Sequence, residues 1–202
     1  MAITRERFER GMTLEQYQAQ MTQNQAPFAE NIAKVSLRPE DVAFFQGLPE
    51  PINVLAITED WCGDALANIP VLAKVASETG KLNLRLFLRD QNLDLADQYL
   101  KEGKYRSIPV FVFFDQQMRA LGHFIERPAR ATAEMAAATA SLVAAHPDIP
   151  DLGGSFETMS DSSKMLRFQM LRQLRQQRGD AWNAMLLEDI AALLAASPAT
   201  RS

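Results

Sequence analysis

The middle of the chain alternates short apolar segments with segments of helical hydrophobic spacing. Residues 52–58 (INVLAIT) and 110–114 (VFVFF) are uncharged and rich in β-forming residues, which is typical of strands buried on both faces of a sheet. Residues 82–88 alternate apolar and polar positions, and a last strand is expected at 119–125. Helices are expected at 62–78, 93–102 and 128–146. The pattern predicts an α/β fold with the order β-α-β-α-β-β-α, covering residues 51–146.

The flanking segments have helical patterns without strands. Residues 1–50 are expected to form a helical N-terminal arm, in which Thr13 and Gln16 have the spacing of a capping box. Residues 147–157 (PDIPDLGGSFE) are expected to form a linker. Two helices, 158–178 and 181–197, are expected beyond it, divided by Gly179-Asp180 because glycine suits a helix end and aspartate an N-cap. The pattern therefore predicts a C-terminal helical hairpin over 158–202.

Composition and charge narrow the class of protein. The 202 residues are 47% hydrophobic and 23% charged, as in ordered globular chains. A net charge of −4 argues against bulk nucleic-acid binding, and no apolar run approaches the ~20 residues that cross a bilayer. The first residues, MAITRERFERG, lack the apolar core of a secretory signal. With a single cysteine the chain forms no internal disulfide, and we expect a cytoplasmic location.

That cysteine, Cys62, lies at the junction between the first expected strand and its helix. A thiol at a helix N-terminus faces the positive end of the helix dipole and main-chain N–H groups, which stabilise a thiolate. The alternative is a buried structural cysteine, the usual state of a cysteine outside a disulfide. The strand-to-helix turn, with Trp61 before the thiol and Gly63 after it, favours a functional position.

Trp61-Cys62-Gly63 resembles the first half of the thioredoxin active-site motif, Trp-Cys-Gly-Pro-Cys. Three further matches are similar to that family: Pro70 within the helix, Ser107-Ile108-Pro109 before the VFVFF strand, and Leu121-Gly122. The sequence looks more narrowly like a bacterial branch of thioredoxin-like proteins in which WCGD is usual. The resemblance implies a thioredoxin-like fold and a catalytic Cys62. It also implies a cis bond at Pro109 and a substrate groove formed by Trp61, Gly63, Asp64, Ile108 and Pro109.

Two departures from the family pattern bear on the reaction. The resolving cysteine of the family motif corresponds to Ala65, and the family's buried aspartate corresponds to Ala56. Without a second thiol the chain cannot release a mixed disulfide by itself, so dithiol reductase chemistry is not expected. Any redox activity would be of the monothiol type.

The acidic residues Glu59, Asp60 and Asp64 flank the thiol. A carboxylate ~7 Å away at an effective dielectric of 20 disfavours a thiolate by about 2 kcal/mol, whereas the helix dipole returns about 0.3–1 kcal/mol. Weak nucleophilicity is therefore expected unless Asp60 points away or pairs with a basic residue. Arg89 and Arg106 are the candidate partners, because both should lie near the same end of the sheet.

Metal and cofactor sites are not expected. Zinc or iron would require more cysteine or histidine, and neither His123 nor His146 has ligand spacing to Cys62. The cluster-binding monothiol glutaredoxins resemble this arrangement, with the motif Cys-Gly-Phe-Ser. Here Cys62 and Gly63 are followed by Asp64 and Ala65 in place of Phe-Ser.

The C-terminal segment carries five cations without an intervening acid: Lys164, Arg167, Arg172, Arg175 and Arg178. A solvated helix face is the favoured interpretation over a surface for an acidic partner or RNA, since no aromatic-interleaved motif accompanies it. The hairpin is a candidate contact between two copies of the chain.

Two hypotheses for function follow. In the first, Cys62 is a monothiol redox centre that forms a mixed disulfide with a partner protein or a small thiol. In the second, the chain is a redox-inactive module that binds extended peptides beside Pro109. No cofactor, membrane or nucleic-acid partner is expected in either case.

Overall fold

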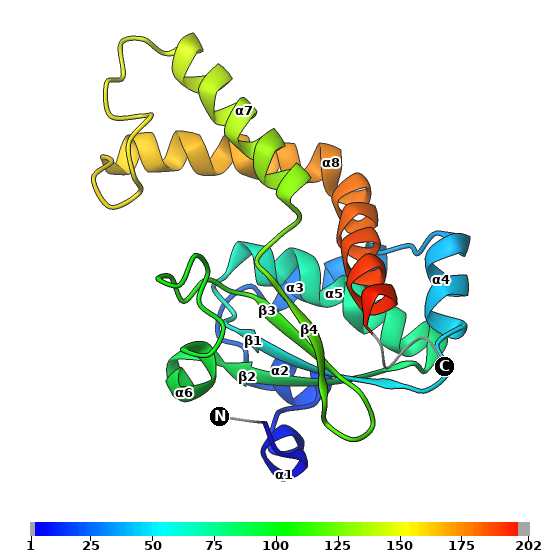
Figure 1. The fold of residues 1–202 in the computed structure, drawn as a ribbon. Coiled ribbons are helices and arrows are strands. Elements are labelled where there is room, and N and C mark those ends of the chain that lie inside the picture. Colours follow the sequence, from blue (N-terminus) through cyan, green and yellow to red (C-terminus); the bar gives the residue numbers. More distant parts are fainter. Residues whose placement is uncertain (1–2, 198–202) are drawn as a thin grey trace. The chain divides into compact units, whose positions relative to one another are not determined.

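The computed structural model describes residues 3–197, and a four-stranded mixed sheet lies at its centre (Figure 1). The strands are β1 (Ile52–Thr58), β2 (Leu82–Leu88), β3 (Val110–Phe114) and β4 (Ala120–Ile125), in the order β2-β1-β3-β4. β1 pairs in parallel with β2 and antiparallel with β3, and β3 pairs antiparallel with β4. Every residue of β1 and β3 is buried, as their uncharged sequences predicted. The α/β class is confirmed.

The helices that connect the strands follow the expected order. α5 (Gly63–Thr79) joins β1 to β2 and lies above the sheet in Figure 1, and the short α6 (Leu93–Ala96) lies beside β2 at the left. The helix expected over 93–102 was wrong in length. Residues beyond Ala96 turn instead, because Lys101 forms a bridge with Tyr105 around a turn in which Gly103 has a φ of 69°.

Within residues 3–50, the N-terminal arm contains four helices: α1 (Arg5–Glu9), α2 (Leu14–Gln20), α3 (Gln25–Lys34) and α4 (Pro39–Gln46). The expected capping box is confirmed, since Thr13 and Gln16 exchange both hydrogen bonds. Between α1 and α2 the arm lies against the edge of the sheet, where Met12 pairs antiparallel with Leu86 of β2. Gly11 is required there, because a Cβ would lie 2.5 Å from the Phe87 ring.

The chain forms two compact units, with Pro128–Met185 in one and the described residues before and after it in the other. The core of the larger unit gathers around β1, β3 and α5, and residues from the end of the chain complete it: Leu186, Leu187, Ile190 and Leu194. Gly122 of β4 makes room for this segment. Its φ is 151°, and a Cβ there would lie 2.7 Å from a methyl group of Leu193.

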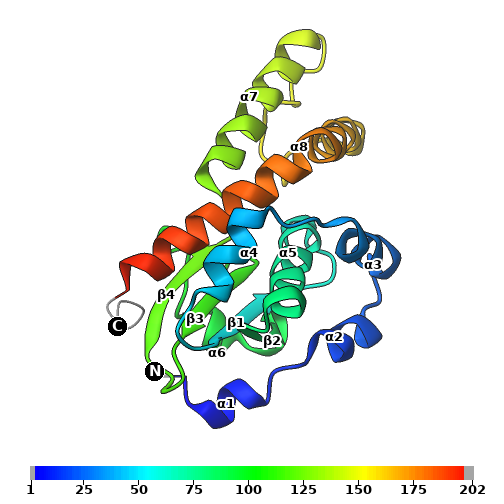
Figure 2. The same ribbon diagram turned by 90° about the vertical axis from the view of Figure 1, so that its right-hand side faces the viewer.

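The smaller unit contains α7 (Ala129–Ala145), residues 146–160 and the first part of α8 (Asp161–Ala196) (Figure 2). The expected break at Gly179-Asp180 was wrong: α8 runs through it as one helix of 36 residues. Glu134 of α7 accepts hydrogen bonds from Arg178 and Trp182, on either side of the glycine. These contacts outweigh the cost of about 1 kcal/mol that a glycine imposes on a helix. The hairpin is therefore formed by α7 and α8.

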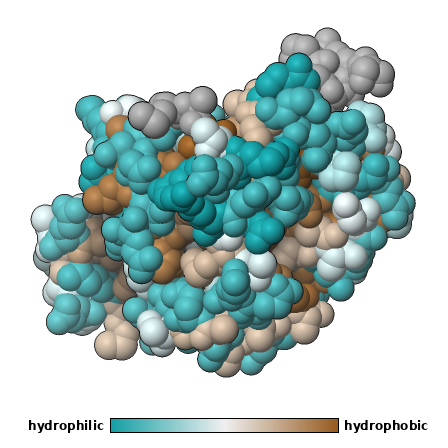
Figure 3. Space-filling view, turned by 90° about the horizontal axis from the view of Figure 1, so that it is seen from below, coloured by the Kyte–Doolittle hydropathy of each residue, from teal (hydrophilic) through white to brown (hydrophobic). Residues whose placement is uncertain are grey.

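Hydrophilic residues cover most of the face shown in Figure 3, with smaller hydrophobic areas between them. Among the described residues, no helix combines the length and the apolar character needed to cross a membrane.

Candidate functional site

Cys62 lies where the end of β1 meets the start of β3. These ends are adjacent because the two strands run antiparallel, with Ile57 opposite Val110. Cys62 is the N-cap residue of α5, and its side chain makes no capping hydrogen bond. Its Sγ donates to the carbonyl oxygen of Ile108 at 3.4 Å, and the Ile108–Pro109 peptide bond is cis. The thiol is thus placed at a helix N-terminus and against the segment that precedes β3, with 8% of the residue exposed.

A shallow groove of about 380 Å³ opens at the thiol. Its lining residues are Trp61, Cys62, Asp64, Arg89, Tyr105, Arg106, Ser107, Ile108 and Glu126. Trp61 forms an exposed wall, over whose ring the Arg89 guanidinium lies at 5.0 Å. Three of the predicted substrate-binding residues, Trp61, Asp64 and Ile108, therefore lie together with Cys62. Gly63 begins α5, and Pro109 is buried and is not among the residues that line the groove.

Asp60 points away from the thiol and into the N-terminal arm. Its Oδ2 accepts hydrogen bonds from the main-chain N–H groups of Thr22 and Gln23 at 2.7 and 3.0 Å, and from the Thr22 hydroxyl at 3.1 Å. Burial alone would raise the pKa of Asp60, but these hydrogen bonds hold it below its usual value. The prediction that Arg89 or Arg106 pairs with Asp60 was wrong.

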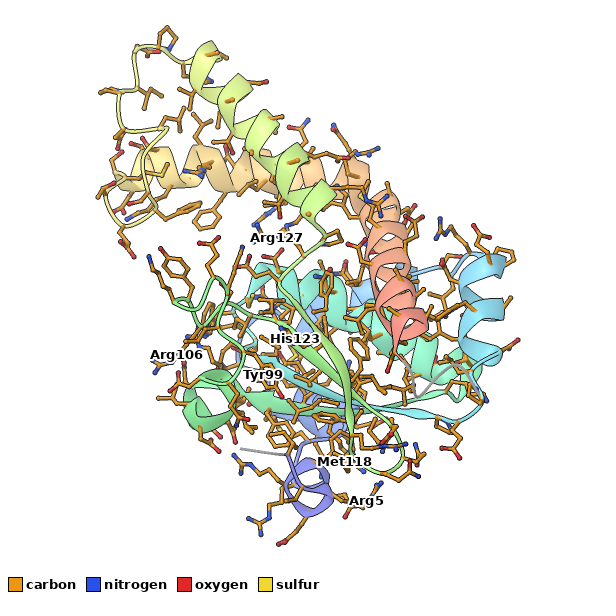
Figure 4. All side chains as sticks on the ribbon, in the orientation of Figure 1. Arg5, Tyr99, Arg106, Met118, His123 and Arg127 are labelled. Carbon is orange, nitrogen blue, oxygen red and sulfur yellow. The ribbon has the colours of Figure 1, made fainter. Side chains whose placement is uncertain are left out.

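Arg89 and Arg106 bind other acids. Arg89 pairs with Asp90 at 2.8 Å and also lies over the Trp61 ring. Arg106 pairs with Asp97 at 2.5 Å, in the loop after α6 (Figure 4). Both arginines line the groove at Cys62, and both also line an adjoining cleft of about 500 Å³.

Glu59 is buried beneath the turn that carries the thiol. Its carboxylate accepts a hydrogen bond from the main-chain N–H of Asp90 at 2.8 Å. Burial raises the pKa of Glu59 despite this hydrogen bond. Glu59 therefore ties the turn after β1 to the turn after β2.

Asp64, in the first turn of α5, forms an ion pair with Arg127. Both side chains are largely buried. Burial opposes the charge of Arg127, but the hydrogen bond and charge of Asp64, with smaller contributions from Glu126 and Cys62, raise the pKa of the guanidinium. The negative charge of Asp64 beside the thiol is thus matched by a positive charge within the same site.

Arg127 is a site residue that the sequence analysis missed. It lies 63 positions from Asp64, and no local motif marks it. A signal was nonetheless present in the strand order. Arg127 follows β4, whose end lies opposite the start of β3, with Ile125 across from Val110. The residue after β4 must therefore lie at the same end of the sheet as Cys62 (Figure 4).

The positions of the missing thiol and the missing acid are closed to solvent. Ala65 and Ala56 are both 0% exposed, in α5 and β1 respectively. No group of three or more histidine, cysteine or acidic side chains suited to a metal ion occurs within residues 3–197. His123 of β4 contacts the Tyr99 ring, with 5.3 Å between ring centres (Figure 4).

Comparisons with known proteins agree with this architecture. A crystal structure of a protein of unknown function from Pseudomonas aeruginosa is 17% identical, with a TM-score of 0.63 and 96% of this chain and 98% of that one covered. An HIV epitope scaffold is also 17% identical, with a TM-score of 0.65 and coverage of 97% and 99%. At these identities the likeness shows the fold alone. No curated protein matches the chain in sequence.

The family follows from the sequence match. A family model described as thioredoxin matches residues 11–141, which include all four strands and the segment around Cys62. The thioredoxin-like fold implied by Trp61-Cys62-Gly63 is confirmed. The chain, whose single cysteine is Cys62, therefore belongs to the thioredoxin family by this match.

Proposed function

We propose that this protein is a monothiol thiol–disulfide exchange protein in which Cys62 forms a mixed disulfide with a cysteine of a bound peptide or with a small thiol. The observation that carries the proposal is the placement of Cys62. The thiol lies at the N-terminus of a 17-residue helix and in the floor of a groove. Of the acids around it, Asp60 is hydrogen-bonded to the N-terminal arm, Glu59 is buried, and Asp64 is paired with Arg127.

The reaction requires two exchanges. The Cys62 thiolate attacks one sulfur of a substrate disulfide, so that a new S–S bond forms at Cys62 and the other substrate sulfur leaves as a thiolate. An external low-molecular-weight thiol, as its thiolate, then attacks the mixed disulfide. It regenerates the Cys62 thiolate and remains joined to the substrate sulfur. The external thiol takes the part of the second cysteine, whose position is occupied by Ala65.

The electrostatics of the site support a reactive thiolate. The positive end of α5 contributes about 0.3–1 kcal/mol, and Arg127 supplies a positive charge that interacts with Cys62. The hydrogen bond from Sγ to the Ile108 carbonyl works in the opposite direction, because only the protonated thiol can donate it. The chemistry therefore depends on the balance between Arg127 and Asp64.

The main chain beside the groove suits an extended peptide. Among the described residues, no hydrogen-bond acceptor lies opposite the N–H groups of Ser107 and Ile108. These groups can pair with a peptide by strand addition, and the Trp61 ring offers an apolar wall for its side chains. A target cysteine held in this way would lie over Cys62.

The test is the pH dependence of Cys62 alkylation in the native protein, read by intact mass. The same protein unfolded in denaturant is a matched control, since its thiol should titrate near the ordinary ~8.5. We expect an apparent thiol pKa in the native protein below that of the unfolded chain. A native value at or above that of the unfolded chain, or no reaction until unfolding, would overturn the proposal.

A second measurement follows the exchange itself. The native protein is treated with bis(2-hydroxyethyl) disulfide, and we expect one mercaptoethanol group on Cys62 that added thiol removes. The Cys62→Ser variant should acquire none. Failure of the native protein to form the adduct at a pH where the unfolded chain does so would contradict the mechanism.

A redox-inactive binding module is the second candidate, favoured by the complete burial of Ala65 and Ala56 where the family pattern has a thiol and an acid. The two functions differ in their dependence on sulfur. A partner that binds the Cys62→Ser variant as tightly as the native protein would favour the module. A partner retained only through a reducible bond would favour exchange chemistry.

A further inference from the structure

The first three turns of α8 expose a face with an acid at one end, a base at the other and two large apolar side chains between them. The residues are Asp161, Met165, Phe168 and Arg172. At 100° per residue they fall within an arc of about 60°. Met165 and Phe168 are 60% and 57% exposed, and the Asp161 side chain is fully exposed. Two large apolar side chains exposed side by side on one helix face form a candidate interaction surface.

The spacing of this face is the same in both directions. The steps from Asp161 to Met165, to Phe168 and to Arg172 are four, three and four residues. Two such helices laid antiparallel around the midpoint of Met165 and Phe168 therefore match one another. Asp161 of each copy then lies opposite Arg172 of the other, and Met165 lies opposite Phe168. An isologous contact requires this kind of self-complementarity.

Neighbouring contacts hold the face ready for a partner. The Phe168 ring packs against Phe156 with 5.0 Å between ring centres, so one side is supported and the other is exposed. Phe156 is fixed in turn by the Arg167 guanidinium, 4.7 Å from its centre, which also donates to the Gly154 carbonyl. Within the described part of the chain Arg172 makes no hydrogen bond or ion pair, and Asp161 has only a 3.7 Å contact with Lys164. The two end charges are thus available.

We propose that this face docks a second copy of the chain, with the two α8 helices antiparallel and an Asp161–Arg172 ion pair at each end. The charges fix the direction, because a parallel arrangement would place Asp161 opposite Asp161 and Arg172 opposite Arg172. One helix pair buries less than the roughly 1,200 Å² of a stable interface, so the dimer forms reversibly and with concentration. The proposal does not depend on Cys62 chemistry.

Charge reversal tests the pairing. Sedimentation of the full chain, under reducing conditions, should show a monomer–dimer equilibrium. Arg172→Asp or Asp161→Arg alone should raise the dissociation constant by at least about tenfold, because two like-charge contacts appear in each dimer. The double variant should restore the native value. Lys34→Asp, on an exposed position of α3, makes the same charge change as Arg172→Asp outside the face and should have no effect.

A crosslinking experiment fixes the register. In the Cys62→Ser background, a mixture of Met165→Cys and Phe168→Cys chains should oxidise mainly to the mixed disulfide dimer. A native protein that is monomeric at all concentrations would overturn the proposal, as would folded single reversals with unchanged dissociation constants. So would a double variant without restoration, or crosslinks confined to like chains.

Discussion

Replacing Arg127 by methionine should raise the pKa of the Cys62 thiol by about one unit. In the native protein Arg127 is ion-paired with Asp64, and both side chains are largely buried. Without Arg127, the negative charge of Asp64 beside the thiol is no longer matched by the guanidinium. At ~7 Å and an effective dielectric of 20 it disfavours the thiolate by about 2 kcal/mol before salt screening. With screening of about one half, and about 1.4 kcal/mol per unit, the expected shift is close to one unit.

The assay is iodoacetamide alkylation followed by intact mass between pH 5 and 10 at low temperature, since removing one partner of a largely buried ion pair also destabilises the fold. Asp64→Asn should lower the thiol pKa, because it leaves the Arg127 charge unbalanced. The Arg127→Met/Asp64→Asn double variant should return toward the native value. Arg127→Lys keeps the charge and should stay near native. Arg119→Met is the matched control, because it removes an arginine paired with Asp115 at the opposite end of β3.

The electrostatic reasoning would be refuted by a folded Arg127→Met protein whose thiol pKa equals the native value. It would also be refuted if the double variant kept the full shift of the single one. In either case the thiol would be controlled by the helix terminus and the Ile108 carbonyl alone.

Three further predictions concern stability. Gly179→Ala should raise the free energy of unfolding by about 0.5–1 kcal/mol, because nothing lies within 4 Å of a Cβ there and α8 is continuous; a loss in urea unfolding would contradict that continuity. Gly122→Ala should lower it by about 1–3 kcal/mol, since its φ is 151° and a Cβ would overlap α8, and an unchanged midpoint would count against this packing. Hydrogen bonds lower the pKa of Glu134 from 4.5 and of Asp151 from 3.8, each to about 2, so the smaller unit should lose stability as pH falls from their ordinary values toward 2. Trp182 fluorescence in a Trp61→Phe background reports this, and a pH-independent signal would refute it.

The sheet was predictable because the composition of its central strands indicates that they are buried. Ile52–Thr58 and Val110–Phe114 are uncharged, and a segment of that kind reaches its lowest free energy inside an α/β sheet. The position of Cys62 at a strand–helix junction followed from the same pattern. The helix boundaries that failed, after Ala96 and at Gly179, were set by contacts with distant segments rather than by local preference.

The electrostatics of the site were the least predictable part. Sequence spacing placed three acids near the thiol, but the direction of each carboxylate depends on partners far along the chain. Asp60 is held by Thr22 and Gln23, and Asp64 by Arg127. A count of the charges near Cys62 in the sequence therefore identified the acidic residues correctly. It gave the wrong net charge at the site, because Arg127 comes from the segment after β4.

The completion of the larger unit by Leu186–Leu194 has a consequence for how the protein is made. Its sheet and α5 are synthesised early, but four apolar residues of its core leave the ribosome only after the whole of Pro128–Met185. Domains ordinarily fold in the order of synthesis. Here the larger unit is the first to be synthesised and the last to be completed. Its apolar surface over β4 stays uncovered while Pro128–Met185 is translated. A nascent chain stalled before residue 186 should accordingly be a substrate for chaperones, even with its sheet already formed.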